Sequence, residues 1–113
     1  MKFTTSQHGT AAVIRLSGNL LGGPDAGVLK TRLQEILDGG TRRVVVDLRE
    51  VGFMNSSGLA MLINGLTTMK SGGGELAIAN ASEKIMTLIK VTKLSAVFRT
   101  YGSVEEALAS FTS

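Results

Sequence analysis

The sequence predicts an α/β fold whose sheet is parallel or mixed. Glycine-rich breaks divide the 113 residues into short apolar runs that alternate with longer stretches of helical spacing. The run at residues 43–48, RVVVDL, places three valines in succession, as expected for a central strand covered on both faces. Strands separated by helices need crossover connections, which favours parallel pairing in the element order ββαβαβαβα.

Two strands are expected at the start of the chain. Residues 2–7 and 11–17 fit this assignment, because the second segment is apolar and rich in β-branched residues. Gly9–Thr10 suits a hairpin turn between them, and Gly18 is expected to end the second strand. The two strands therefore form an antiparallel hairpin before the alternating part of the chain begins.

A first helix is expected to begin at Pro24. Proline suits the first helical turn, where its missing N–H is not needed, and Asp25 complements the positive end of the helix. Gly39–Gly40 then stops the helix. The residues expected on its buried face, from their spacing, are Val28, Leu29, Leu33, Ile36 and Leu37.

The central part of the chain is expected to run from strand to loop to helix. The strand covers residues 43–48, the loop residues 49–55, and the second helix residues 57–70, which a run of three glycines ends. The apolar residues assigned to the buried stripe of this helix are Leu59, Leu62, Ile63, Leu66 and Met69.

Two further strand and helix pairs complete the predicted order. A short strand is expected at residues 75–79, and Ser82 caps a third helix that ends near Val91. The last strand is expected at residues 96–100. Ser103 and Glu106 have the spacing of a capping box at the start of a final helix.

Composition bounds the classes of function. Hydrophobic residues make up 43% and charged residues 19%, and the mean hydropathy is +0.23, so one domain spanning residues 1–113 can bury a core. The net charge of +3 is spread out, and with four Phe, one Tyr and no Trp the chain lacks the pattern of a nucleic-acid binder. No run is long enough to span a membrane, and there is no signal peptide, so a cytoplasmic protein is expected.

The residues that could carry catalysis or bind metal are few. Cysteine is absent, and His8, the single histidine, is expected on the surface near a turn, so no metal site is predicted. Asp47, at the end of the central strand, is interpreted as a structural residue bonded to the neighbouring loop. No serine hydrolase motif or phosphate loop is present. The chain is therefore predicted not to be an enzyme and to need no cofactor.

The segment after the central strand allows two interpretations. In the simpler one, Asn55 or Ser56 caps the second helix and Gly58 lets the helix start pack against the sheet. In the other, the hydroxyls of Ser56 and Ser57 lie at a helix N-terminus beside the apolar pair Phe53–Met54. That position favours an anion, and a phosphoserine there would add a charge of about −1.5 to −2 to a protein interface.

Nearly the whole chain resembles a bacterial STAS domain of the anti-sigma-factor antagonist type. The most specific part of the resemblance is Phe53-Met54-Asn55-Ser56-Ser57-Gly58-Leu59. Supporting parts are Gly18-Asn19-Leu20, the VVVDL strand, the glycine-rich turn before Glu75-Leu76, and Leu94-Ser95-Ala96-Val97-Phe98. The resemblance implies a mixed sheet with about four helices packed largely on one side of it.

The resemblance also implies partner switching. When unphosphorylated, the protein would bind an anti-sigma factor that is also a GHKL-type serine kinase. The kinase would use ATP to phosphorylate Ser56, with Ser57 as second choice, and the partner would be released until a serine phosphatase reverses the change. A monomer is expected. The implied partner-binding residues are Phe53, Met54, Asn55, Ser56, Ser57 and Gly58, flanked by Met61, Leu21, Gly22, Gly23 and Asp25.

Two departures from the family pattern leave other functions open. Asn55 stands where the family usually has Asp, and Leu21 replaces an acid that often meets the kinase, with Asp25 as a possible substitute. One alternative is a scaffold subunit of a stress-signalling complex or of a membrane lipid or anion transporter, in which Ser56 only caps the helix. Another is a small-molecule or nucleotide-binding module that uses the loop between strand and helix.

Overall fold

Five strands lie side by side in the order in which they occur along the chain. The computed structural model describes residues 1–94 and 96–112, so Ser95 of the predicted motif at residues 94–98 lies outside the described residues. β1 and β2 pair antiparallel and all later neighbours pair parallel, which confirms the predicted mixed sheet. The strands are β1 (Lys2–His8), β2 (Ala11–Leu20), β3 (Arg43–Met54), β4 (Glu75–Ala79) and β5 (Arg99–Tyr101).

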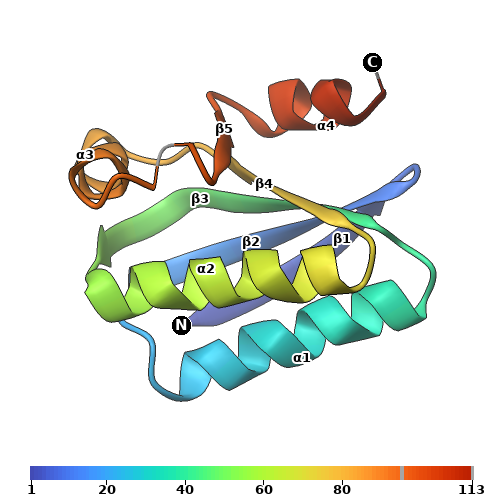
Figure 1. Cartoon of the computed structure of the whole chain (residues 1–113), viewed down its shortest axis with the longest axis horizontal. Coiled ribbons are helices and arrows are strands. Elements are labelled where there is room, and N and C mark those ends of the chain that lie inside the picture. Colours follow the sequence, from blue (N-terminus) through green and yellow to red (C-terminus); the bar gives the residue numbers. More distant parts are fainter. Residues whose placement is uncertain (95, 113) are drawn as a thin grey trace.

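Three of the four described helices cover one face of this sheet, and the fourth covers the other (Figure 1). This arrangement confirms the prediction that the helices pack largely on one side. It also explains the crossover pattern, because α1, α2 and α3 each connect two strands of the parallel part. The helices are α1 (Pro24–Asp38), α2 (Ser56–Ser71), α3 (Glu83–Val91) and α4 (Val104–Thr112).

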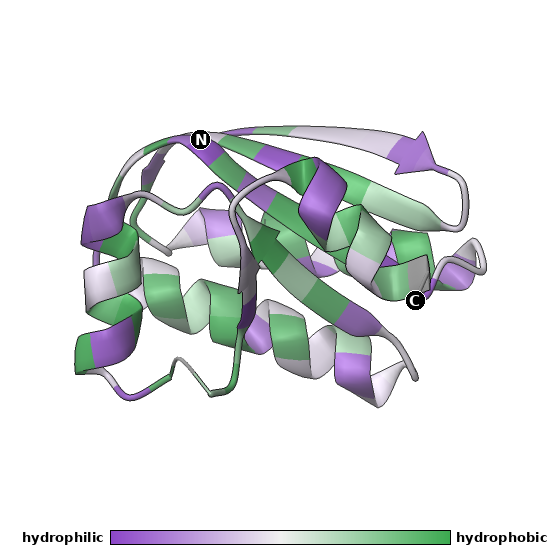
Figure 2. Cartoon of the chain, turned by 90° about the horizontal axis from the view of Figure 1, so that it is seen from above, coloured by the Kyte–Doolittle hydropathy of each residue, from purple (hydrophilic) through white to green (hydrophobic). Residues whose placement is uncertain are grey.

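The central strand β3 contributes to both hydrophobic clusters. Val44 and Val46 point into the larger cluster beneath α1 and α2, whereas Val45 points into the smaller one beneath α4. All three valines are fully buried, as the run of valines predicts for a strand covered on both faces. In Figure 2, β4 is largely coloured as hydrophobic and the edge strand β1 mostly as weakly or strongly hydrophilic.

Three predicted strand boundaries are wrong. β2 continues through Gly18 to Leu20, and β3 continues through the predicted loop to Met54. These extensions pair with each other across two register shifts, one of them next to Gly18, whose φ is +112°. Because each shift interrupts the alternation of inward and outward side chains, no regular pattern in the sequence marks the extensions. At the other end, β5 begins only at Arg99, and the described residues from Ala96 form a turn.

The buried face of α1 is narrower than predicted. Leu29 and Leu33 are fully buried, Ile36 and Leu37 are half-buried, and Val28 is 41% exposed. Val28 is one residue before Leu29 and hence about a quarter of a turn away from it, beyond the stripe that meets α2 and the sheet. Assigning Val28 to the core was therefore wrong. The predicted start at Pro24 and the stop at Gly39 are confirmed.

Candidate functional site

The beginning of α2 is capped by Asn55. Its backbone is extended and its side-chain Oδ1 accepts a hydrogen bond from the Gly58 N–H at 2.8 Å. Of the two caps that the sequence allowed, the structure therefore selects Asn55 over Ser56. Ser56 and Ser57 occupy the first two helical positions, are exposed, and form no side-chain hydrogen bond with any described residue. Backbone N–H groups at these positions have no acceptor within the helix.

The start of α2 is pressed against the end of β2, and this contact requires glycine at position 58. A Cβ atom at Gly58 would lie only 2.0 Å from the Leu20 carbonyl oxygen. The same oxygen accepts a hydrogen bond from the Asn55 N–H at 3.3 Å. The predicted role of Gly58, allowing the helix start to pack closely against the sheet, is confirmed. These contacts place Ser56 beside the chain that leaves β2.

The loop between β2 and α1 lies against the same helix start. A Cβ atom at Gly22 would be 3.0 Å from the Ser57 Cβ, and both Gly22 and Gly23 have positive φ angles of 83° and 64°. The structure therefore brings this loop together with Ser57, although more than thirty residues separate them in the sequence. Asp25 is half-buried in the first turn of α1, just beyond this loop.

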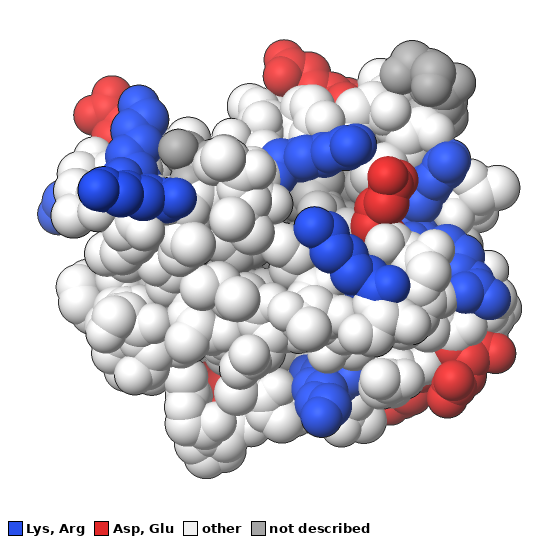
Figure 3. All heavy atoms as spheres, viewed as in Figure 1, with Lys and Arg blue, Asp and Glu red and all other residues white. Residues whose placement is uncertain are grey.

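Two large apolar side chains are exposed near the hydroxyls, Phe53 with 55% exposure and Leu21. Met54 is buried, and Met61 is only 2% exposed. Met61 belongs to the buried stripe of α2, so we interpret it as a residue that supports the site from inside. The area over the beginnings of α1 and α2, at the lower left of Figure 3, is mostly without charged side chains in that view.

An apolar groove next to the site includes residues that the sequence analysis did not single out. It has a volume of about 310 Å³ and lies between the end of β3 and α3. We call it the β3–α3 groove. The sequence does contain one indication of this groove. Val91 is an apolar residue at the exposed end of a short amphipathic helix. The lining residues are Gly52, Phe53, Met54, Lys84, Ile85, Thr87, Leu88 and Val91.

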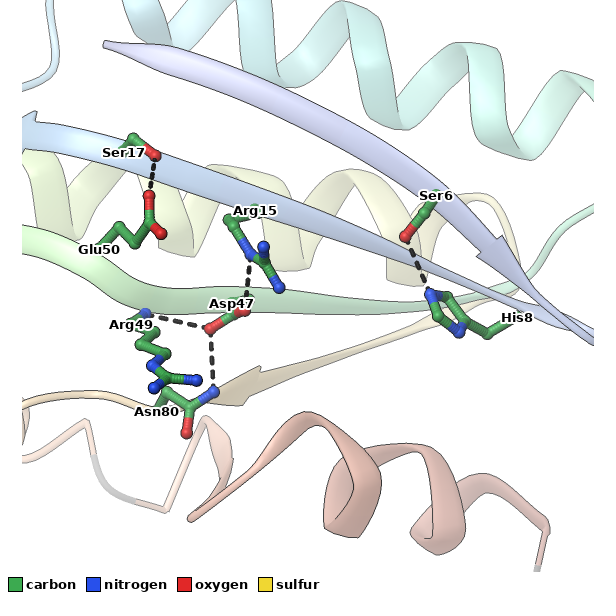
Figure 4. A network of polar contacts seen from close by, with 8 residues as sticks. All are labelled: Ser6, His8, Arg15, Ser17, Asp47, Arg49, Glu50 and Asn80. Atoms are coloured by element: carbon green, nitrogen blue, oxygen red, sulfur yellow. Dashed lines mark hydrogen bonds and ion pairs between the residues drawn. The ribbon is translucent and has the colours of Figure 1, made fainter.

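Asp47 forms a second polar centre on β3, on the face covered by α4. It is 1% exposed and accepts hydrogen bonds from Arg15 Nε at 3.1 Å, Asn80 Nδ2 at 3.0 Å and the Arg49 N–H at 3.0 Å (Figure 4). Burial raises the pKa of the Asp47 carboxyl, but these hydrogen bonds and the charge of Arg15 outweigh it and leave the pKa below its ordinary value. The predicted structural role of Asp47 is confirmed.

The remaining candidate, His8, is exposed at the end of β1, and its Nε2 lies 2.9 Å from the Ser6 Oγ. Its predicted surface position is confirmed. Among residues 1–94 and 96–112, no three His, Cys, Asp or Glu side chains are grouped so that they could hold a metal ion. None of the described helices is both long and apolar enough to cross a membrane.

Comparison with known proteins identifies the class. The sequence profile of the STAS domain matches residues 2–107, and the chain belongs to this family. A Thermotoga maritima protein named as an anti-sigma factor antagonist is 27% identical over 74 residues, which is 66% of each chain, slightly less than two thirds. BtrV of Bordetella bronchiseptica is also named as an anti-sigma factor antagonist. It is 25% identical to this chain over 98% of this chain and 95% of its own length.

Further relatives carry related names. The anti-sigma-B factor antagonist of Staphylococcus aureus is 33% identical over 66 residues, 55% of this chain and 61% of its own. Among solved structures, the Thermotoga maritima protein has a TM-score of 0.84 at 22% identity, covering 96% of this chain and 92% of that one. Phosphorylated SpoIIAA of Bacillus has a TM-score of 0.72 at 18% identity, covering 97% and 99%. At these identities the structures show a shared fold.

Proposed function

We propose that this chain is an anti-sigma-factor antagonist whose partner binding is switched by phosphorylation of Ser56. The observation that carries the proposal is the position of Ser56. Its hydroxyl is exposed at the first turn of α2, it is not used as the helix cap, and it follows the exposed Phe53 by three positions in the sequence. The names of the relatives support an anti-sigma factor as the partner. That this partner is also a GHKL-type serine kinase is our proposal from the resemblance of the sequence to the antagonist family.

Phosphate at Ser56 is compatible with the free protein. The N–H groups at the first helical positions and the helix dipole favour an anion, so a phosphoryl group there does not oppose folding. Asn55 adds no negative charge beside the serine, and no acidic residue occurs between Glu50 and Gly74. The uncomplexed chain can thus carry the modification at little cost in stability.

In a packed interface the same phosphate is unfavourable. A group with a charge of about −1.5 to −2 that is buried without a partner costs several kcal/mol in lost solvation. A loss of about 3 kcal/mol weakens binding more than a hundredfold. In sequence, Ser56 lies between the exposed Phe53 and Ser57, the residue that the β2–α1 loop approaches, so a partner covering both would also cover the phosphate.

The site residues divide into two groups in this proposal. Phe53, Leu21 and the two serines are exposed and would contact the partner directly, with Gly23 and Asp25 at the edge. The buried residues Met54, Gly58, Met61 and Gly22 hold the helix start in place instead. A metal-dependent serine phosphatase would restore the unphosphorylated form, and ATP would be bound by the kinase.

The test combines phosphorylation with binding. Incubation with ATP and the candidate kinase is expected to add one phosphate, about 80 Da by intact mass, to the wild type and to Ser57→Ala but not to Ser56→Ala. Titration calorimetry should then show at least about a hundredfold weaker binding of the modified protein. Equal affinity of both forms would overturn the switch, and a lack of modification in cells under growth and stress would favour the scaffold function.

A further inference from the structure

The β3–α3 groove has the properties of a small-ligand site. Its volume of about 310 Å³ falls at the lower end of the range for such sites, and its lining is mostly apolar. Met54 and Ile85 are buried and form its floor, whereas Phe53 and Val91 stand at its rim with 55% and 72% exposure. Two walls from different elements enclose the space, so an elongated apolar molecule would be covered on both sides.

The charge of the groove limits which ligand it fits. Lys84 is the one charged residue among those that line it, and no acidic side chain does so. Lys84 forms neither an ion pair nor a hydrogen bond with any described residue. It belongs to the first turn of α3, where the helix dipole also favours negative charge. The groove thus combines an apolar body with one unpaired cation.

We propose that the β3–α3 groove binds an aliphatic carboxylate, with its chain between Phe53 and Leu88 and its carboxylate paired with Lys84. The aliphatic chain of the ligand covers apolar surface of Phe53 and Val91 and removes it from water, which provides the binding free energy. The carboxylate supplies the negatively charged partner that Lys84 lacks in the free protein. The ligand is a single free molecule in this proposal, because a space of about 310 Å³ has the size of a small-ligand site.

Binding to the isolated protein tests the site without reference to the proposed partner switch. Octanoate and 1-octanol are the probes, since they share one chain length and differ in charge. Methyl NMR of Met54, Leu88 and Val91 reports the groove directly. We expect saturable shifts of these methyls, a Kd on the order of 1 mM for octanoate, and about fivefold weaker binding of octanol at low salt.

Three substitutions of exposed residues separate the two contributions. Lys84→Gln should remove the preference for octanoate over octanol, whereas Lys90→Gln, on the same helix but outside the groove lining, should retain it. Val91→Ser should weaken both probes about threefold, because it removes apolar contact but no charge. Because all three side chains are exposed, each variant is expected to keep the wild-type methyl spectrum without ligand.

Several results would overturn the proposal. These are the absence of saturable shifts up to about 20 mM octanoate, shifts confined to other methyls, and an unchanged preference in Lys84→Gln. Groove shifts that depend on protein concentration alone would assign the groove to a second copy of the chain. Sedimentation with phosphatidylglycerol vesicles, without binding of octanoate, would assign it to a membrane surface. Partner binding is not part of the assay, so failure here leaves the switch of Ser56 unaffected.

Discussion

Two polar regions of the same strand differ in how their hydrogen-bonding groups are used. In the middle of β3, Asp47 is buried and accepts three hydrogen bonds from three segments of the chain. Just beyond the end of β3, the side chains of Ser56 and Ser57 are exposed and bond to no described residue. The carboxylate of Asp47 is thus buried with its hydrogen bonds formed, whereas the two serine hydroxyls are exposed to solvent near the exposed Phe53.

This difference separates a structural site from the proposed binding site. A buried carboxylate is costly unless it is paired, so the bonds of Asp47 are needed for the fold itself. An exposed hydroxyl beside an exposed aromatic side chain adds nothing to stability and is free to meet a kinase or a partner. The close packing of Gly58 against Leu20 and the Asn55 cap determine where the hydroxyls lie. Stability measurements can therefore distinguish the framework of the site from its chemistry.

The largest expected effect is on the framework, in Gly58→Ala. The added methyl would meet the Leu20 carbonyl oxygen at 2.0 Å, a backbone atom that can move only with β2. We expect the free energy of unfolding in urea to fall by about 3 kcal/mol, at the upper end of the cost of overpacking. Gly27→Ala in α1 is the matched control, because nothing lies within 4 Å of its added methyl. It should gain about 0.5 to 1 kcal/mol from helix propensity.

If Gly58→Ala lost no more stability than an average surface substitution, the start of α2 would not be pressed against β2 as described. The exposure of the two serines would then be variable, and their placement beside the β2–α1 loop would carry less weight.

The next effect concerns Asp47→Asn. Asparagine retains an acceptor but cannot pair with Arg15, so we expect a loss of about 2 kcal/mol at pH 7, with half-exposed Arg15 screened by water. Asp38→Asn, an exposed acid at the end of α1, is the control and should change stability by less than about 0.5 kcal/mol.

The effect of Asp47 should depend on pH in a defined direction. The pKa of Asp47 is lowered in the folded protein, so its contribution is complete above the unfolded pKa of about 3.9 and is lost as pH falls through the folded pKa. Urea unfolding of wild type and Asp47→Asn should thus differ equally at pH 5 and pH 7 and converge below about pH 4. A difference that grows on acidification would contradict the sign of the shift.

The sequence predicts these two regions unequally well. Asp47 and the run of valines before it form a local pattern, and the structural role follows from a charged residue in a buried strand. The extension of β3 to Met54 depends instead on pairing with β2 across two register shifts, a long-range contact with no period of its own. The β3–α3 groove is equally invisible in the sequence, since its two walls are about thirty residues apart. Met61 is also buried, although the helical spacing that defines the predicted stripe of this helix leaves it out, so its burial depends on tertiary packing.

A smaller effect is expected from Asn55→Ala. It removes the one side-chain cap of α2 and leaves the Gly58 N–H without its side-chain acceptor, at a cost of about 1 kcal/mol. Ser82→Ala removes the corresponding cap of α3 and should cost a similar amount. Asn64→Ala, an exposed residue within α2, controls for loss of an amide and should be neutral or slightly stabilising. Thermal unfolding provides the comparison, and a loss in Asn64→Ala as large as that in Asn55→Ala would argue against capping.

The smallest effect on stability is expected where the functional consequence is largest, in Ser56→Ala. The hydroxyl makes no hydrogen bond with described residues and Asn55 provides the cap, so the free energy of unfolding should change by less than about 0.5 kcal/mol. Ser57→Ala should be similarly mild, because alanine keeps the Cβ that faces Gly22. Urea unfolding of both variants, beside the kinase assay, then distinguishes two roles. A loss of 1 kcal/mol in Ser56→Ala would make its hydroxyl part of the framework, like Asp47. If Ser56→Ala keeps its stability and incorporates no phosphate, the Ser56 hydroxyl serves phosphorylation and does not stabilise the fold.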